Sequence, residues 1–412
     1  MASKKELFKF TKWLMLASGI WRLKITIASG FLQNLYKVYS ITSQIIYDSV
    51  VIMFIVEFYR LYTVDRAKAV ENLSRLIFVV LLIVKLTLCQ SEKMIDLLSL
   101  TLDEESRISA INDPETQKIY RIHVKYSNSL TAIIAICSFS LAIYLTEMGF
   151  ESNYKSNRRQ KFDNDTLETA LAVQVWYPFD KNKHFGIVMA HQTVEILLTA
   201  LYSGSVHAFS NSVMIYLRAQ LKILQHYFRH FHHPFDRFEN DLRTRSSFHI
   251  LRNYCRKHQK LINWIEEFNG SFKYIMFLEY CVSSLLLAAV IFQIFAGIEV
   301  LFNTVYLVLI ICQLMALAWN ADEILVEVEV ITLAIDEYPV IFQSTKLSLA
   351  LYESEWYNQD KKVIILIHFM MQKCRTPLTL NIGAFGPMTV SAALSRFKLA
   401  YSYVSVMSSG TA

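Results

Sequence analysis

Long apolar runs separated by short polar segments dominate the hydrophobic pattern of this chain. A helix needs about 20 mostly apolar residues to cross a bilayer. The clearest run, residues 300–321, contains no charged residue, and residues 129–146 are almost as apolar. Five other runs carry a few charged side chains each. The pattern therefore predicts seven transmembrane helices, at residues 39–59, 76–100, 129–146, 186–217, 272–297, 300–321 and 387–409.

The distribution of Lys and Arg predicts how these spans are oriented. Ten of them lie between Arg218 and Lys260, in the segment that joins the fourth and fifth spans. Cytoplasmic loops retain Lys and Arg, so this segment and the basic N-terminus are expected inside. Seven spans then leave the C-terminus outside, which is the reverse of a G-protein-coupled receptor. Sequons at Asn72 and Asn164 fall in predicted outer loops, whereas Asn269 falls inside.

Composition agrees with an all-α, polytopic membrane protein. Apolar residues make up 54% and charged residues 18% of the chain, and the mean hydropathy is +0.31. Soluble chains carry about 25% charged residues. Only 10 Gly and 6 Pro are present, which fits long helices. The net charge of +6 lies in loops between apolar runs, so we expect a membrane and no nucleic-acid partner.

Residues 322–375 differ from the spans, because apolar and charged residues alternate there over stretches too short to cross a membrane. We interpret them as cytoplasmic helices whose apolar faces need a partner, and hence as an assembly interface. The expected organisation is a transmembrane bundle at 1–320, a cytoplasmic anchor region at 321–386 and a C-terminal helix at 387–412.

Signals of catalysis are absent from the sequence, which has no GxSxG, HExxH, Walker loop or CxxC pair. We therefore expect neither an enzyme nor a cofactor. His226 and His230 are one helical turn apart, a spacing that metal ligands use, and two more histidines follow before Pro234. Because no close carboxylate or cysteine completes the set, we interpret these histidines as a solvated basic helix end and expect no metal.

Ionisable residues inside spans are costly and are functional candidates by default. They are Asp48, Lys85, Glu195, Lys273 and Glu279. We expect the two lysines to extend to a membrane interface and the carboxylates to face other helices. For Glu195 both a packing role and a functional role stay open, because two further polar residues lie in the same span.

The last span carries a small, semi-polar stripe. Steps of three and four from Ser395 lead through Leu399, Ser402, Val406 and Ser409. Such a stripe lines water or lets two helices pack closely, and on the pattern alone close packing is the commoner explanation. If it lines water, a ring of Val406 side chains forms a hydrophobic gate that closes by dewetting.

Several motifs near the C-terminus occur in a specific order. They are Glu355-Trp356-Tyr357, the stretch TPLTLNIGAF at 376–385 and the stretch FKLAYSY at 397–403. Further upstream stands WYPFD at 176–180. In this order and spacing the chain resembles the insect odorant receptor family. The usual Phe in the first turns of the last span is missing, and residues 322–351 are slightly expanded.

The resemblance implies a tetrameric, ligand-gated, non-selective cation channel in the plasma membrane of a sensory-neuron dendrite. The last helix would line the pore, and the cytoplasmic helices would anchor the subunits. The middle cytoplasmic loop is shorter than in the shared co-receptor, Orco, so this chain is expected to be the odorant-specific subunit of a heterotetramer with Orco. The resemblance also implies that a small volatile odorant binds the outer half of spans two, three, four and six, at Phe78, Val79, Leu82, Ser138, Ala142, Leu145, Met189, Gln192, Ile196, Phe302 and Tyr306.

Two alternatives stay open at this point. Gustatory receptors form a related class of channels, but their last span usually carries Thr-Tyr followed by Gln-Phe, where this chain has Tyr401-Ser402 and no Gln-Phe. A G-protein-coupled chemoreceptor would have the opposite orientation in the membrane and a different mechanism.

Overall fold

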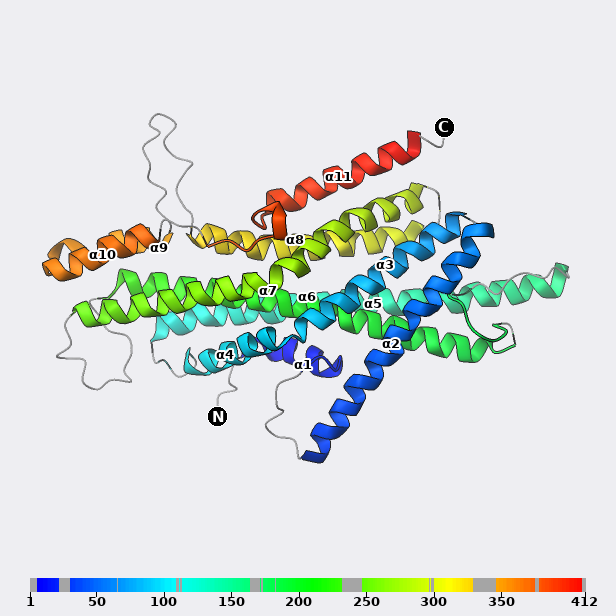
Figure 1. The fold of residues 1–412 in the computed structure, drawn as a ribbon, viewed down its shortest axis with the longest axis horizontal. Coiled ribbons are helices and arrows are strands. Elements are labelled where there is room, and N and C mark those ends of the chain that lie inside the picture. The colour runs from blue at the N-terminus through cyan, green and yellow to red at the C-terminus, as the bar shows by residue number, and fades with distance from the viewer. Residues whose placement is uncertain are drawn as a thin grey trace.

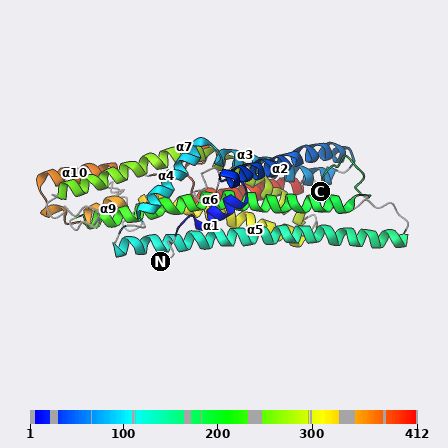
Figure 2. The ribbon, with the colours of Figure 1, turned by 90° about the horizontal axis from the view of Figure 1, so that it is seen from below.

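The chain folds into an elongated bundle of helices, shown by the computed structural model in Figure 1 and, turned by 90°, in Figure 2. The structure describes residues 6–21, 30–64, 66–108, 111, 113–163, 171, 173–181, 183–231, 247–295, 297, 300–328, 346–374 and 378–409. The helices are α1 (Lys9–Ala17), α2 (Gly30–Val64), α3 (Arg66–Cys89), α4 (Glu92–Ile108), α5 (Pro114–Asp163), α6 (Phe185–Arg229), α7 (Ser247–Phe295), α8 (Val300–Val328), α9 (Lys346–Tyr352), α10 (Lys361–Lys373) and α11 (Val390–Ser409).

Within the described residues, six helices are long and apolar enough to cross a membrane. They are α2, α3 from Glu71 to Cys89, α5 from Pro114 to Glu151, α6, α7, and α8 from Val300 to Ile324. Each overlaps one of the predicted spans. The seventh predicted span is a helix, α11, whose serines and basic residues keep it outside this set.

The second predicted span, residues 76–100, is wrong as a single helix. Helix α3 ends at Cys89 and α4 begins at Glu92. The turn between them has its own hydrogen bonds, because the Ser91 carbonyl accepts from Met94 N at 3.0 Å. The chain becomes polar here, and α4 leaves the apolar layer to pack against α7 with one apolar face.

Helix α6 is the centre of the bundle and is buried along most of its length. It packs against α5, α8, α9, α1 and α7. Some of its buried polar side chains form hydrogen bonds with neighbouring helices, which offsets the cost of burying them. Ser212 Oγ lies 2.7 Å from Thr11 Oγ1 of α1, and Asn211 Oδ1 accepts from Asn320 Nδ2 of α8 at 2.7 Å. These contacts fix α1 and α8 to the central helix.

The anchor region differs in part from the prediction. The predicted boundary between residues 320 and 321 falls inside α8, which continues to Val328, and residues 329–345 lie outside the described residues. Helix α10 buries Val363, Ile367 and Met370 and leaves Phe369 66% exposed. The segment therefore has one packed apolar face and one open apolar face.

A tight loop leads into α11. Gly383 has φ +51°, and a Cβ added there would lie 2.9 Å from the Phe277 ring, so this position requires glycine. Phe385 stacks on Phe277 of α7 with ring centroids 5.4 Å apart. Asn269 of α7 holds the same loop, because its Oδ1 accepts from Asn381 N at 2.9 Å. The Gly-x-Phe motif thus attaches the start of α11 to α7.

Candidate functional site: a cavity beside the terminal helix

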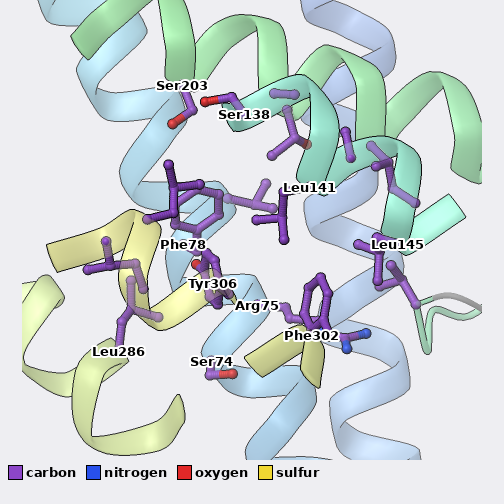
Figure 3. A pocket seen from close by; sticks show the side chains of 18 of the residues that line it. Ser74, Arg75, Phe78, Ser138, Leu141, Leu145, Ser203, Leu286, Phe302 and Tyr306 are labelled. Atoms are coloured by element: carbon purple, nitrogen blue, oxygen red, sulfur yellow. The ribbon is translucent and has the colours of Figure 1, made fainter. Parts of the chain in front are cut away.

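A largely apolar cavity of about 190 Å³ lies where α2, α3, α5, α6, α7 and α8 meet (Figure 3). An apolar cavity of about 150 Å³ is enough to bind benzene, so this one has room for a compact organic molecule. Its lining consists of Tyr47, Val50, Phe54, Ser74, Arg75, Phe78, Val79, Ser138, Leu141, Ala142, Leu145, Val173, Glu195, Ile196, Thr199, Ala200, Ser203, Leu286, Val290, Gln293, Phe302, Asn303, Tyr306, Leu309, Ile310 and Gln313.

Most of the residues expected at a ligand site come together here. The structure brings to the cavity wall Phe78, Val79, Ser138, Ala142, Leu145, Ile196, Phe302 and Tyr306. The other three expected residues, Leu82, Met189 and Gln192, are buried but do not line the cavity. Gln192 donates from Nε2 to the Val173 carbonyl at 2.7 Å, so its amide secures the segment that precedes α6 to this helix.

Two walls were missed by sequence reasoning, because the expectation drew on spans two, three, four and six only. Helix α2 contributes Tyr47, Val50 and Phe54, and α7 contributes Leu286, Val290 and Gln293. Both sets follow steps of three or four residues, which is the signal that marks one face of a helix. That periodicity shows that a face is buried, but it does not show what the face borders.

Aromatic rings and serine hydroxyls occupy different parts of the cavity. Phe302 and Tyr306 are stacked with ring centroids 6.0 Å apart. In Figure 3, Ser138 and Ser203 lie together at one end, away from Phe302 and Arg75. Ser138 is 6% exposed, and its hydroxyl has no hydrogen-bond partner among the described residues. A ligand in this cavity therefore contacts mostly apolar side chains, with polar groups at the ends of the cavity.

An ion pair buried between α3 and α7 lies beyond the cavity, and it corrects the expectation for Lys85. Lys85 Nζ contacts Glu279 Oε2, and the two side chains are 5% and 11% exposed. The lysine thus pairs inside the bundle and does not extend to an interface. Each partner is about two helical turns from the cavity wall, Lys85 from Phe78 and Glu279 from Leu286, about 10 Å along its helix. Lys273 is half-buried, and its Nζ lies 5.1 Å from the Tyr274 ring centroid.

Three further expectations are wrong. Asp48 does not face another helix of the bundle but is exposed on α2. Asn72 lies within α3 and is 2% exposed, and its Nδ2 donates to the Gln174 carbonyl at 2.7 Å, so it is not in a loop. His226 is not solvated, because its Nε2 lies 3.3 Å from the Asp113 carboxylate. His232 and His233, Pro234, and the sequon at Asn164 are outside the described residues.

Helix α11 packs against α7 and α8 at the edge of the bundle (Figure 1). Ala393 and Ala400 are buried on its inner face, whereas Ser395 and Ser402 are exposed on the opposite side. Leu399 is half-buried. Val406 and Ser409 belong to the last turns of α11, and their side chains fall outside the described residues.

The cavity and α11 share a wall. Ala400 of α11 packs in one apolar cluster with Val290 of α7 and Ile310 of α8, and Tyr306 packs against this cluster. Those three α7 and α8 residues also line the cavity. A displacement of this wall by a ligand would therefore reach α11 through direct van der Waals contact, since packed interiors have few voids to absorb it.

Comparison with known proteins identifies the family. The family model described as 7tm Odorant receptor matches residues 65–335. Odorant receptor 10 of Aedes albopictus is 22% identical over 203 residues, which cover 48% of this chain and 49% of that protein. Odorant receptor Or2 of Anopheles gambiae is 19% identical over 160 residues, 38% of each chain. The matched part thus spans half the length of these curated relatives or less.

Solved structures share the fold over nearly the entire chain. The insect olfactory receptor OR5 from Machilis hrabei superposes with a TM-score of 0.73 at 15% identity, covering 97% of both chains. The same receptor in complex with eugenol gives a TM-score of 0.72 at 16% identity, covering 97% of this chain and 96% of that one. With a family model that matches well over half of its residues, this chain is a multi-pass membrane protein of the insect odorant receptor family.

Proposed function

We propose that this chain is the odorant-binding subunit of a ligand-gated, non-selective cation channel. A small volatile odorant binds in the cavity, and α11 lines a pore that opens in response. The observation that carries the proposal is the shared wall, because Val290, Tyr306 and Ile310 border the cavity on one side and pack toward Ala400 of α11 on the other. The eugenol complex of the Machilis hrabei receptor supports a small organic ligand.

The pore role rests on the outward face of α11. Ser395 and Ser402 are exposed in the single subunit, on the side opposite the buried alanines. Leu399, Val406 and Ser409 continue this line along the helix. In a heterotetramer with the co-receptor Orco, this face turns toward the shared axis and Val406 forms the hydrophobic gate. The open apolar face of α10, with Phe369 66% exposed, supports contacts between subunits beneath the membrane.

Ligand binding opens the pore only if the ligand has different affinities for the closed and open states. The cavity provides that difference when the wall made by α7 and α8 has two positions, one of which fits the ligand better. In this mechanism the N-terminus is cytoplasmic, the C-terminus is outside, and the receptor lies in the plasma membrane of a sensory dendrite.

Current recordings test the mechanism. We expect an odorant panel to evoke currents in cells that express this chain together with Orco. Replacing Ala142, which is 5% exposed on the cavity wall, by Trp should abolish these currents and leave surface expression intact. The matched control is Ile143→Trp on the next residue, which is 53% exposed and points away from the bundle. Equal currents from both variants would remove the cavity from the proposal.

A G-protein-coupled mechanism is the competing function, and two measurements separate it. A tag on Ala412 should be stained on intact cells, whereas a receptor with the opposite orientation is stained only after permeabilisation. Currents that vanish with G-protein inhibitors would overturn the channel mechanism. Val406→Ala should also change the conductance or the resting leak, since it widens the proposed gate, and an unchanged channel would exclude Val406 from it.

A further inference from the structure

A carboxylate, Glu195, interrupts the apolar lining of the cavity. Glu195 is 8% exposed and lies on α6 beside Ile196, one turn before Thr199. Burying a carboxylate is costly unless donors satisfy it, so its partners show whether it has a structural role or remains available for a ligand.

The protein supplies Glu195 with one neighbour and leaves it short of donors. His191 Nε2 lies 3.0 Å from Oε1, which is an ion-pair distance. Apart from His191, no donor reaches Oε1 among the described residues. No side chain of the described ranges donates to the other oxygen either. A carboxylate accepts up to about four hydrogen bonds, so most of this capacity is unused.

The histidine beside Glu195 is itself held in place. The Tyr177 hydroxyl lies 3.0 Å from His191 Nδ1, and the two rings meet edge to face at 81°. Burial, and then the nearby Glu195 carboxylate, raise the pKa of Tyr177, so its hydroxyl stays protonated. Tyr177 and His191, which do not line the cavity, thus form a buttress that holds Glu195 in place.

The other charged residue of the lining does not neutralise Glu195. The Arg75 guanidinium lies 2.6 Å from the Glu71 carboxylate on the same helix, so Glu71 balances the charge of Arg75. Toward the cavity, then, Glu195 presents an acceptor-only group in apolar surroundings. In such surroundings a charge-assisted hydrogen bond is stronger than one in water.

We propose that Glu195 selects ligands that carry a hydrogen-bond donor, namely amines, alcohols or phenols on a compact apolar body. This inference rests on the proposed function, because it assigns the ligand class of the same cavity. Acceptor-only molecules such as aldehydes and ethers are disfavoured, since they leave the buried carboxylate without a donor and place a second acceptor against it. A site that hydrogen-bonds a ligand group rejects the analogue that lacks this group far more strongly than an apolar pocket rejects a missing methylene.

Five probes with one aromatic ring test this class at nearly constant size. Benzyl alcohol and benzylamine carry donors, benzaldehyde and anisole carry acceptors only, and toluene carries no polar group. Binding to the purified full-length chain in detergent is measured by thermal stabilisation, which needs neither a partner subunit nor a current. We expect the two donor compounds to bind at least about tenfold more tightly than the others.

Variants assign this preference to Glu195. Glu195→Gln keeps the size of the side chain and adds a donor, so it should reduce the preference to less than about twofold by admitting benzaldehyde and anisole. Tyr177→Phe removes only the outer hydroxyl of the buttress and should weaken the preference without abolishing it. Thr193→Val is the matched control, because Thr193 lies on the same helix outside the cavity lining, and it should leave the preference unchanged.

Each result decides between the two proposals. Similar affinities for all five probes, or an unchanged preference in Glu195→Gln, would overturn the role of Glu195 and leave the cavity as a ligand site. If Glu195→Gln does not fold, the probe series on the wild-type chain and on Tyr177→Phe still decides. Binding that survives Ala142→Trp undiminished would overturn the cavity itself. Absence of binding by every probe would overturn the inference and count against the proposed function as well.

Discussion

The buried ion pair between Lys85 and Glu279 offers the sharpest test of how the bundle is held together. The two side chains are 5% and 11% exposed and belong to two helices that are long and apolar enough to cross a membrane. Removing one member of such a pair leaves an uncompensated buried charge, which typically costs about 3–5 kcal/mol. Replacing both members by apolar residues of similar volume is often neutral, because the desolvation cost disappears together with the attraction.

The magnitudes for single and double variants follow from this asymmetry. We expect Lys85→Met and Glu279→Leu each to lower the free energy of unfolding by about 3–5 kcal/mol, more than a hundredfold in the equilibrium constant. The free energy of unfolding should fall less in the double variant than in either single variant. The pair connects α3 and α7 about two turns from Phe78 and Leu286, so the single variants should also loosen the cavity.

SDS-induced unfolding of the purified chain in mixed micelles, followed by circular dichroism, measures these differences. Lys273→Met is the matched control on the same helix as Glu279. Lys273 is only half-buried and lies over the Tyr274 ring, so its loss should cost about 1 kcal/mol or less. The reasoning is refuted if Lys85→Met is as mild as this control, or if the double variant is less stable than both single variants.

Three further predictions concern the junction before α11 and the C-terminal end of α10. Gly383→Ala should destabilise the chain by about 1–3 kcal/mol in the same assay, because φ is +51° and the added Cβ meets Phe277 at 2.9 Å. Arg396→Met should cost about 1–2 kcal/mol, since its guanidinium lies 4.7 Å from an aromatic ring of that junction, and no loss would mean the contact is incidental. Burial raises the pKa of Cys374 to about 12, so its thiol should react with maleimide at neutral pH only after unfolding. In a Cys374→Ser background, Lys373→Cys on the exposed neighbouring position should react in the folded state.

The long helices were predictable because a bilayer imposes a local rule. Twenty apolar residues in sequence suffice to indicate a span, whatever the rest of the chain does. The break between α3 and α4 was not predicted. Hydrophobicity is averaged over about 20 residues, and this average hides a turn as short as Gln90-Ser91. The family was also predictable, because short motifs such as Gly383-Ala384-Phe385 serve backbone geometry that few other residues can satisfy.

The candidate site was predictable only in part, because cavity residues are defined by which helices are neighbours. Phe78 and Phe302 were found through the resemblance, whereas Val290 required the knowledge that α7 packs against both α8 and α11. The same reason explains the error for Lys85. Extending to an interface is the default for a lone lysine, and the partner that makes burial tolerable is on a helix far along the chain.

Helix α7 connects the features on which the proposed mechanism depends. One face carries Glu279 toward α3, another carries Val290 to the cavity, and Phe277 holds the loop that begins α11. Because packed helices shift as rigid elements more readily than they deform, a ligand that moves α7 acts at once on the ion pair and on the terminal helix. The ion pair restrains one side of α7 and the ligand contacts another. In the proposed mechanism the balance between them sets the resting position of α11, so weakening the ion pair should change the leak current of the proposed channel as well as the stability of the bundle.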